Sequence, residues 1–199
     1  MPTTTGLIVC STRSPRAGLQ ISTFIHETIK QAHPQASITV IDLAEWNLPL
    51  YNEPGIPSCI TSAEGYEHEH TKAWSREISR YDAFIFVTPQ YNWGYPASIK
   101  NALDYLFSEW KGKPAMIVSY GGHGGGKAAA QLQQVLQGLR MITLDKTVGL
   151  TFPEKELLTR AAKGEDLGLE GERGVWTGER ETIQDLFGEL IEVVGRKSG

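Results

Sequence analysis

The chain has 199 residues, with 40% hydrophobic residues, 21% charged residues and a formal net charge of −4. These values are typical of a globular protein with a real core and argue against intrinsic disorder. The sequence has no basic stripe, so nucleic acid is a poor partner, and its early apolar run, Leu7–Cys10, is too short for a signal peptide or a membrane span. The two cysteines, Cys10 and Cys59, are too few for a disulfide framework. We expect a soluble cytoplasmic protein with residues 1–199 in a single domain.

Short apolar runs alternate with helical patterns along the chain. The first strand is expected at residues 6–10, followed by a helix over about residues 17–32 and a second strand at 37–42. The next segment, 43–62, is rich in proline, and a loop of this length in a compact domain is usually functional. The later elements are expected as a helix at 65–80, a strand at 83–88, a helix at 96–109, a strand at 114–119, a helix at 127–139, a strand at 143–149, and helices at 154–162 and 176–194.

Apolar strands of this kind are typical of a parallel sheet that is buried on both faces. We predict an α/β fold, a doubly wound five-stranded parallel sheet in the order 2-1-3-4-5 with helices on both faces. In such a sheet, ligands bind at the carboxyl ends of the strands, near the point where the strand order reverses. The loops 11–16, 89–95 and 120–126 leave three of these ends, so the topology predicts one composite site.

The first of these loops, residues 11–16, contains residue types that commonly bind phosphate in proteins. It precedes a helix, whose free N–H groups and dipole attract an anion. A hydrogen bond to a charged group contributes about 1.5–3 kcal/mol, against about 0.3–1 kcal/mol for the dipole, so side chains should dominate the affinity. The candidate phosphate ligands are Ser11, Arg13 and Arg16. The alternative is a serine N-cap beside arginines that face solvent.

The other two loops favour a flat ligand. The second loop, PQYNWGYP, has aromatic faces for stacking and carboxamides for the edge of a heterocycle, and it lies at a strand end, where packing alone does not require aromatic residues. The third, GGHGGG, permits close approach of the backbone, whose N–H groups can stabilise negative charge on a ring. Taken alone it fits an ordinary glycine-rich turn equally well, and His123 is expected to be exposed.

Cys10 and Arg16 have the Cys-x5-Arg spacing of low-molecular-weight tyrosine phosphatases. Ala17 stands where that pattern has serine or threonine, and the chain contains no Asp-Pro pair to serve as general acid. We expect Cys10 to be a buried structural residue and retain a phosphatase as a remote alternative. His68 and His70 would point to different faces of a helix, so no metal site is expected.

Three segments carry a resemblance to a known family: CSTRSPR, TPQYNWGYPASIKNALDYL and SYGGHGGGKAAAQLQQVLQGLRM. With Leu48-Pro49-Leu50-Tyr51, they make residues 6–150 similar to the NAD(P)H-dependent FMN reductases, a flavodoxin-like family that includes quinone and azo-dye reductases. The resemblance implies FMN as cofactor and NAD(P)H as co-substrate. Cys10 stands where many members have glycine, which leaves the start of the phosphate loop tighter here.

The resemblance also implies which residues contact FMN. Those at its phosphate would be Ser11, Arg13 and Arg16; those along one side of its ring would be Pro89, Gln90, Tyr91, Asn92 and Trp93; and those at its pyrimidine end would be Tyr120, Gly121 and Gly122. The helix that contains residues 100–104 would meet its counterpart in a homodimer.

The implied reaction is a transfer of hydride from NAD(P)H to the flavin, followed by electron transfer to a quinone or similar acceptor in a ping-pong mechanism. The cofactor carries this chemistry, so no side chain is assigned as catalytic. Two alternatives remain, a flavodoxin-type electron carrier and a flavin-binding sensor without its own NAD(P)H activity. Flavodoxins usually have a Thr/Ser-rich phosphate loop with a glycine and a strongly acidic composition, and this chain has neither.

Overall fold

A parallel sheet forms the centre of the computed structural model, which describes residues 3–169 and 174–197. Its strands lie in the order β2-β1-β3-β4-β5, and β6 also pairs with β4. The strand bounds are Thr4–Val9 for β1, Ser37–Asp42 for β2, Ala83–Pro89 for β3, Pro114–Gly121 for β4, Ile142–Thr143 for β5 and Val148–Thr151 for β6. The predicted parallel sheet with the order 2-1-3-4-5 is confirmed, with one strand more than expected.

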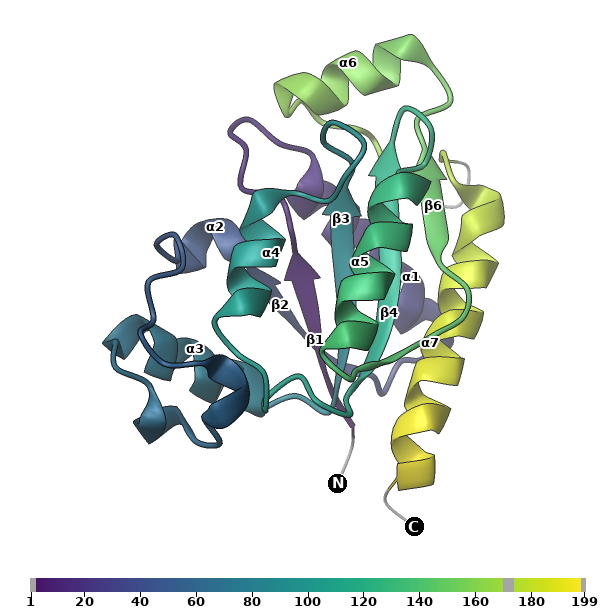
Figure 1. Cartoon of the computed structure of the whole chain (residues 1–199). Coiled ribbons are helices and arrows are strands. Elements are labelled where there is room, and N and C mark those ends of the chain that lie inside the picture. Colours follow the sequence, from purple (N-terminus) through teal and green to yellow (C-terminus); the bar gives the residue numbers. More distant parts are fainter. Residues whose placement is uncertain (1–2, 170–173, 198–199) are drawn as a thin grey trace.

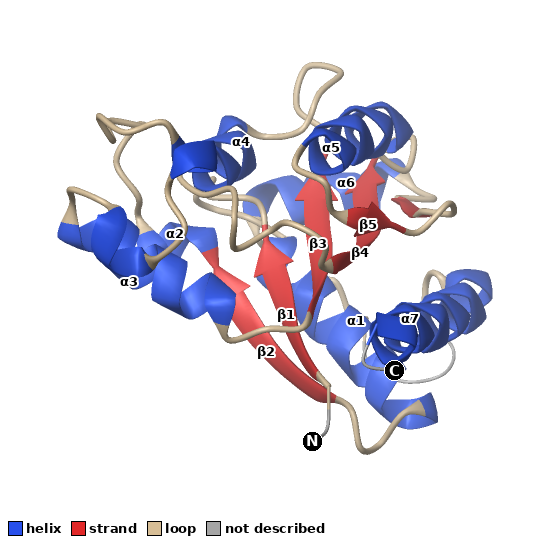
Figure 2. Cartoon of the chain, turned by 60° about the horizontal axis from the view of Figure 1, so that its bottom comes forward, coloured by secondary structure: helices blue, strands red, loops and turns tan. Residues whose placement is uncertain are grey.

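Helices cover both faces of this sheet (Figures 1 and 2). Their bounds are Gly18–Ala32 for α1, Leu43–Trp46 for α2, Glu69–Ser79 for α3, Ala97–Asp104 for α4, Gly126–Gly138 for α5, Lys155–Lys163 for α6 and Thr177–Lys197 for α7. The helices α2 to α5 pack on one face, and α1 and α7 pack on the other. None of the helices in the described part of the chain is long and apolar enough to cross a membrane.

The two faces are buried because successive side chains of a strand point to opposite sides. In β1, Leu7 and Val9 belong to the core under α1 and α7, whereas Ile8, and Cys10 directly after the strand, belong to the core under α2 to α5. The side chains of Phe84 and Phe86 on β3 extend the second core. This double burial explains why the strands read as continuous apolar runs in the sequence.

The fifth strand differs from the prediction of one strand at 143–149. The backbone N–H of Leu144 still donates to the Ala115 carbonyl of β4 (3.0 Å), but the Leu144 carbonyl accepts from the Gln133 side chain (2.9 Å). The Gln133 side chain of α5 thus occupies the Leu144 carbonyl, which would otherwise accept a hydrogen bond from a neighbouring strand. The strand is therefore divided into β5 and β6.

Helix boundaries also differ from the prediction on this side of the molecule. The helix expected at 65–80 begins only at Glu69, because the Glu53 carboxylate accepts hydrogen bonds from the Glu67 N–H and from Thr71 Oγ1 (2.7 Å). The loop expected at 43–62 contains α2 and a short 3₁₀ turn, and α4 ends at Asp104, five residues before the predicted end at 109.

Strand register brings the three predicted loops to the same edge of the sheet. Val9 at the end of β1 pairs with Val87, and Pro89 at the end of β3 pairs with Tyr120. The helix α6 lies above this edge, at the top of Figure 1. The composite site is therefore bounded by strand ends below and by α6 above.

Candidate functional site

The helix α1 begins beside a buried hydroxyl group. The Ser11 side chain is 1% exposed, and its Oγ has no hydrogen-bond partner among the described residues. The N-terminus of α1 has no side-chain cap and no acidic residue in its first turn. Gly18 makes the close approach possible, because a Cβ atom there would lie 2.2 Å from the Ser11 Oγ and 3.0 Å from the Tyr120 hydroxyl. A buried donor beside an uncapped helix N-terminus is a suitable place for an anion.

The two predicted phosphate-binding arginines are placed differently. Arg13 is exposed, and its Nε donates to the Pro15 carbonyl (3.1 Å). Arg16 is turned toward Asp42 at the end of β2, with Nη1 2.7 Å from Oδ1 and Nη2 also bonded to the same carboxylate. This pairing raises the pKa of Arg16, and Nη1 donates in addition to the Ser11 carbonyl. Arg13 is thus accessible to a ligand, whereas Arg16 holds the loop in place.

The second loop is a tight turn over residues 91–94. The Tyr91 and Gly94 backbones exchange hydrogen bonds of 2.8 and 3.0 Å, and both central residues, Asn92 (φ 46°) and Trp93 (φ 71°), have positive φ. Asparagine adopts this conformation readily, but a bulky residue such as tryptophan does not. The turn is fixed from α5, where Gln131 Nε2 donates to the Trp93 carbonyl (3.2 Å). Backbone strain of this kind clusters at functional sites.

Gln90 links the second loop to the third. Its Oε1 accepts hydrogen bonds from the backbone N–H groups of Lys127 (3.1 Å) and Ala128 (3.3 Å), so it caps α5. This long-range cap replaces a local one, since Gly125 at the N-cap has no side chain to offer. These hydrogen bonds connect the second loop to the start of α5, which follows the third loop.

Two tyrosine phenols extend from the second and third loops toward the first. Burial raises the pKa of Tyr91, and the charges of Arg13 and Arg16 offset part of that rise. Burial likewise raises the pKa of Tyr120, with the Ser11 hydroxyl and Arg13 acting in the opposite direction. Both phenols stay protonated at neutral pH and can donate hydrogen bonds. Residues predicted from three separate loops therefore meet at one place.

The glycine-rich loop depends on glycine at its packed positions. Gly125 has φ 76°, and a Cβ atom there would lie 2.9 Å from Ser119 Cβ and 3.0 Å from the Tyr120 backbone N and O. Gly126, next in the chain, has open space around the equivalent position. The loop thus lies directly on the end of β4, while Gly122 and His123 are exposed at its tip. The expectation that His123 is exposed is confirmed.

The helix α6 packs against the first and third loops. Gly164 at its C-cap has φ 68°, and a Cβ atom there would lie 2.8 Å from Pro15 Cβ and 3.2 Å from the Arg16 backbone N. Arg13 Nη2 lies 3.5 Å from the Ala162 carbonyl, and Leu158 lies 3.8 Å from the Cβ position of Gly122. No motif in the sequence predicts this contact.

The Leu48–Tyr51 segment is fastened to α4. The Asn101 side chain donates to the Pro49 carbonyl (2.7 Å) and accepts from the Tyr51 N–H (2.8 Å). Between this segment, α2 and α4 lies a groove of about 420 Å³, which Thr12 of the phosphate loop also lines. The proline-rich segment therefore forms one wall beside the site.

Two interpretations of reactive side chains can be compared with the structure. Cys10 is fully buried, and burial raises the pKa of its thiol far above neutral pH, so it is no phosphate nucleophile. His68 precedes α3, and its ring stacks on His70 with centroids 5.1 Å apart. The expectation that these two rings point to different faces was wrong, because only His70 lies within the helix.

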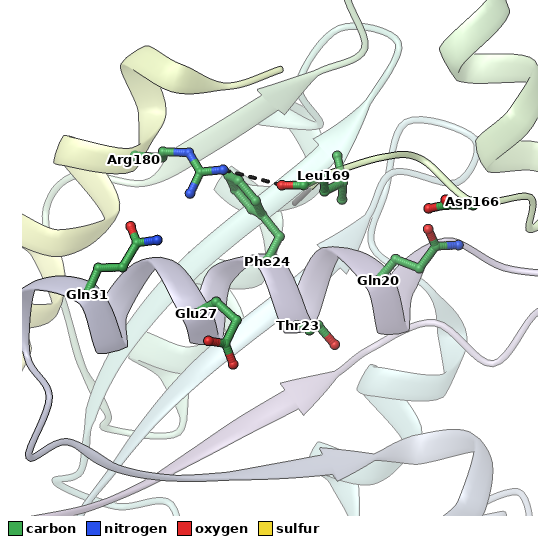
Figure 3. Close-up of a pocket in the computed structure, with 8 residues that line it drawn as sticks. All are labelled: Gln20, Thr23, Phe24, Glu27, Gln31, Asp166, Leu169 and Arg180. Atoms are coloured by element: carbon green, nitrogen blue, oxygen red, sulfur yellow. Dashed lines mark hydrogen bonds between the residues drawn. The ribbon is translucent and has the colours of Figure 1, made fainter. Parts of the chain in front are cut away.

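A separate pocket of about 590 Å³ lies between α1 and α7 (Figure 3). Arg180 and Phe24 both line this pocket, and the Arg180 guanidinium lies 4.5 Å from the centroid of the Phe24 ring. The same group donates to Thr28 Oγ1 (3.3 Å) and, as the dashed line shows, to the Leu169 carbonyl (3.3 Å). These contacts join the two helices, and none of the predicted site residues lines this pocket.

The sequence matches a family model described as NADPH-dependent FMN reductase over residues 3–154. A protein of Saccharomyces cerevisiae named NAD(P)H-dependent FMN reductase is 46% identical over 142 residues, which are 68% of this chain and 74% of the relative. A protein of Pseudomonas putida named quinone reductase is 35% identical over 139 residues, covering 66% of this chain and 67% of the relative. Among solved structures, the flavoenzyme NAD(P)H:(acceptor) oxidoreductase FerB of Paracoccus denitrificans has a similar fold, with a TM-score of 0.69 at 20% identity over 98% of both chains. The chain belongs to the NADPH-dependent FMN reductase family.

Proposed function

We propose that this protein is an FMN-dependent oxidoreductase that takes electrons from NAD(P)H and passes them to a quinone or similar small acceptor by a ping-pong mechanism. Family membership supports the cofactor and the electron donor, and the name of the Pseudomonas putida relative supports the acceptor. The observation that carries the proposal is the buried Ser11 hydroxyl, which lies beside the uncapped N-terminus of α1 and near the Tyr120 phenol, and for which the geometry of the described residues gives no hydrogen-bond partner. An orphaned buried hydroxyl loses free energy unless a ligand completes its hydrogen bond.

The residues present fit FMN, which combines a phosphate with a flat ring. Ser11 Oγ, the exposed Arg13 and the free N–H groups at the start of α1 suit the phosphate. The ring would lie between the second and third loops, against the proposed residues Pro89, Gln90, Tyr91, Asn92, Tyr120, Gly121 and Gly122, with the proposed residue Trp93 at the exposed end of this set, where its side chain also borders an open groove. Bound FMN would supply the redox chemistry.

The residues of the chain would bind FMN, orient its ring and shield its phosphate from water. Arg16 positions the phosphate loop through Asp42, a role that differs from the direct phosphate contact expected from the sequence. Backbone N–H groups of the glycine-rich loop would stabilise negative charge at the edge of the bound ring. The helix α6, which packs on the first loop at Gly164, would limit the access of water to the phosphate end of bound FMN.

An absorption spectrum with successive additions tests the proposal. The protein reconstituted with FMN should be yellow, lose its flavin absorbance on anaerobic addition of NADPH, and recover it when a quinone follows. A protein that cannot be loaded with FMN contradicts the whole proposal. A loaded protein that NAD(P)H does not reduce is an electron carrier or a flavin-binding sensor instead.

Ser11 and Ser22 provide a matched pair of variants. Both hydroxyls are 1% exposed and neither has a hydrogen-bond partner among the described residues, but only Ser11 lies at the strand ends. Ser11→Ala should weaken FMN binding roughly tenfold or more, as expected for a lost hydrogen bond to a charged group. Ser22→Ala should leave it unchanged. Equal FMN affinities for the two variants would remove Ser11 from the site.

The remaining proposals concern assembly and location. We propose that the whole chain acts as a single domain and forms a homodimer through the face that carries α4. Large apolar side chains are exposed near this face, with Leu50 85% and Ile56 67% exposed. Light scattering on the eluted protein tests the dimer. A cytoplasmic location fits an exposed and unpaired Cys59.

A further inference from the structure

An open groove of about 720 Å³ lies between the turn at 91–94 and the first turn of α5. The side chains that give it its chemistry are Asn92, Trp93, His123 and Lys127. Because its walls come from the second and third loops, the groove is continuous with the proposed flavin-ring site. None of the described residues that line it carries a carboxylate.

Trp93 presents an aromatic face to this groove. Its side chain is 69% exposed, which is unusual for so large an apolar group, and its backbone is held at positive φ. The Gln131 hydrogen bond to its carbonyl, together with the two bonds between Tyr91 and Gly94, keeps the turn in this strained form. A strained and exposed tryptophan is well suited to stack on a planar ligand ring.

Lys127 and His123 supply positive charge and hydrogen-bond donors. The Lys127 side chain makes no hydrogen bond or ion pair within residues 3–169 and 174–197, and the same holds for His123. The Gln90 carboxamide already caps the Lys127 N–H, so the helix N-terminus itself is occupied and the side chain is the free group. The first turn of α5 contains no acidic residue. The field in the groove therefore favours a phosphate.

We propose that this groove binds the adenosine end of NADPH, with Trp93 stacking on the adenine and Lys127 and His123 contacting the 2′-phosphate. This inference rests on the proposed function, and it assigns a preference for NADPH over NADH to two side chains. A phosphate monoester carries close to two negative charges at neutral pH, so an unpaired lysine beside it contributes much more to NADPH than to NADH, whose ribose has a hydroxyl at that position.

The test compares Lys127→Ala with Lys146→Ala in the FMN-loaded protein. Lys146 is an exposed lysine in the connection between β5 and β6, outside the groove. The Michaelis constants for NADPH and NADH are measured, and calorimetry gives the affinities for adenosine 2′,5′-bisphosphate and for 5′-AMP. Lys127→Ala should raise the constant for NADPH roughly tenfold and weaken the bisphosphate similarly, with changes below twofold for NADH and 5′-AMP. Lys146→Ala should change none of these values.

The outcomes separate this inference from the proposed function. A wild-type protein that prefers NADH, or a Lys127→Ala variant that discriminates between the two nucleotides as the wild type does, overturns the assignment while the oxidoreductase activity stands. Equal weakening of both nucleotides also overturns it, because Lys127 would then contact a group they share. A protein that binds the bisphosphate at Lys127 but is not reduced by NADPH would retain the subsite and contradict the proposed function.

Discussion

The guanidinium of Arg16 and the carboxylate of Asp42 form a two-point ion pair that joins the first loop, residues 11–16, to the end of β2. Their side chains are 15% and 4% exposed, so solvent screens the pair only weakly. The Asp42 Oδ1 also accepts the Ala44 N–H at the start of α2 (3.0 Å). One carboxylate therefore fixes both the loop and the neighbouring helix.

If Arg16 positions the loop, Arg16→Ala and Asp42→Asn should weaken FMN binding to a similar extent. The asparagine retains an oxygen for the α2 cap, but it removes the charge and puts an NH2 donor in place of Oδ2, the oxygen that accepts from Arg16 Nη2. Each variant should lower the free energy of unfolding by about 2–3 kcal/mol, because one buried charge loses its partner. Fluorescence titration with FMN and urea unfolding measure the two effects. A much larger loss of FMN affinity in Arg16→Ala alone would show direct contact with phosphate.

Gly125→Ala should destabilise the protein and weaken FMN binding. The new methyl group would meet Ser119 and the Tyr120 backbone at 2.9 to 3.0 Å, in a conformation that alanine rarely adopts. We expect a loss of about 2 kcal/mol or more in urea unfolding. Gly126→Ala is the control, since open space surrounds that position and the residue lies in α5. Equal stabilities of the two variants would contradict the packing of this loop on β4.

Gly164→Ala should loosen the contact between α6 and the phosphate loop. Both Gly164 (φ 68°) and Gly168 (φ 62°) have positive φ, but only at Gly164 would a Cβ atom meet Pro15 and Arg16. Backbone strain of about 1–2 kcal/mol should therefore appear in both variants. A weaker FMN complex should appear only in Gly164→Ala. Equal FMN affinities of Gly164→Ala and Gly168→Ala in a titration would show that the contact of α6 with the first loop does not affect FMN binding.

Lys113 should make stability rise with pH in mildly alkaline solution. Burial lowers its pKa to about 8, with the charges of Asp82 and Glu109 acting in the opposite direction. Since lysine in the unfolded chain titrates at about 10.4, above pH 8 the unfolded state keeps a proton that folded Lys113 loses, and this group alone raises stability by at most about 1.4 kcal/mol per pH unit. Cys10 acts in the opposite direction, because its thiol ionises at about pH 8.5 in the unfolded chain and burial keeps it protonated in the folded protein. The Lys113 contribution is therefore the difference between the slopes of the wild type and of a variant without this lysine.

Lys113→Met removes this titration and should make the slope of stability against pH more negative than in the wild type, because the opposing titration of Cys10 remains. Urea unfolding at pH 7, 8, 9 and 9.5 measures it for the wild type, for Lys113→Met and for the exposed control Lys146→Met. The control should retain the wild-type slope. Identical slopes in all three proteins would show that Lys113 is solvated in the folded state. Lys113→Met also loses the hydrogen bond from Lys113 Nζ to the Ile78 carbonyl (2.8 Å), so the slopes of the three proteins are compared and not their absolute stabilities.

The sequence alone determined the parallel sheet, its strand order 2-1-3-4-5 and the three loops that leave its strand ends. A strand that is buried on both faces, such as Ala83–Pro89, is a continuous run of apolar residues. Such a run can be recognised in the sequence without knowledge of the rest of the structure. Breakers such as Pro89 and the glycines after Tyr120 likewise mark where strands end and loops begin.

Only the tertiary structure decided how polar side chains are paired. Arg16 meets Asp42, which is 26 positions away, and the Gln133 side chain interrupts the fifth strand. The contact of Gly164 with Pro15 spans most of the chain. Local periodicity does not encode such pairs, because the energy of a hydrogen bond depends on which groups the packed elements bring within about 3 Å of each other.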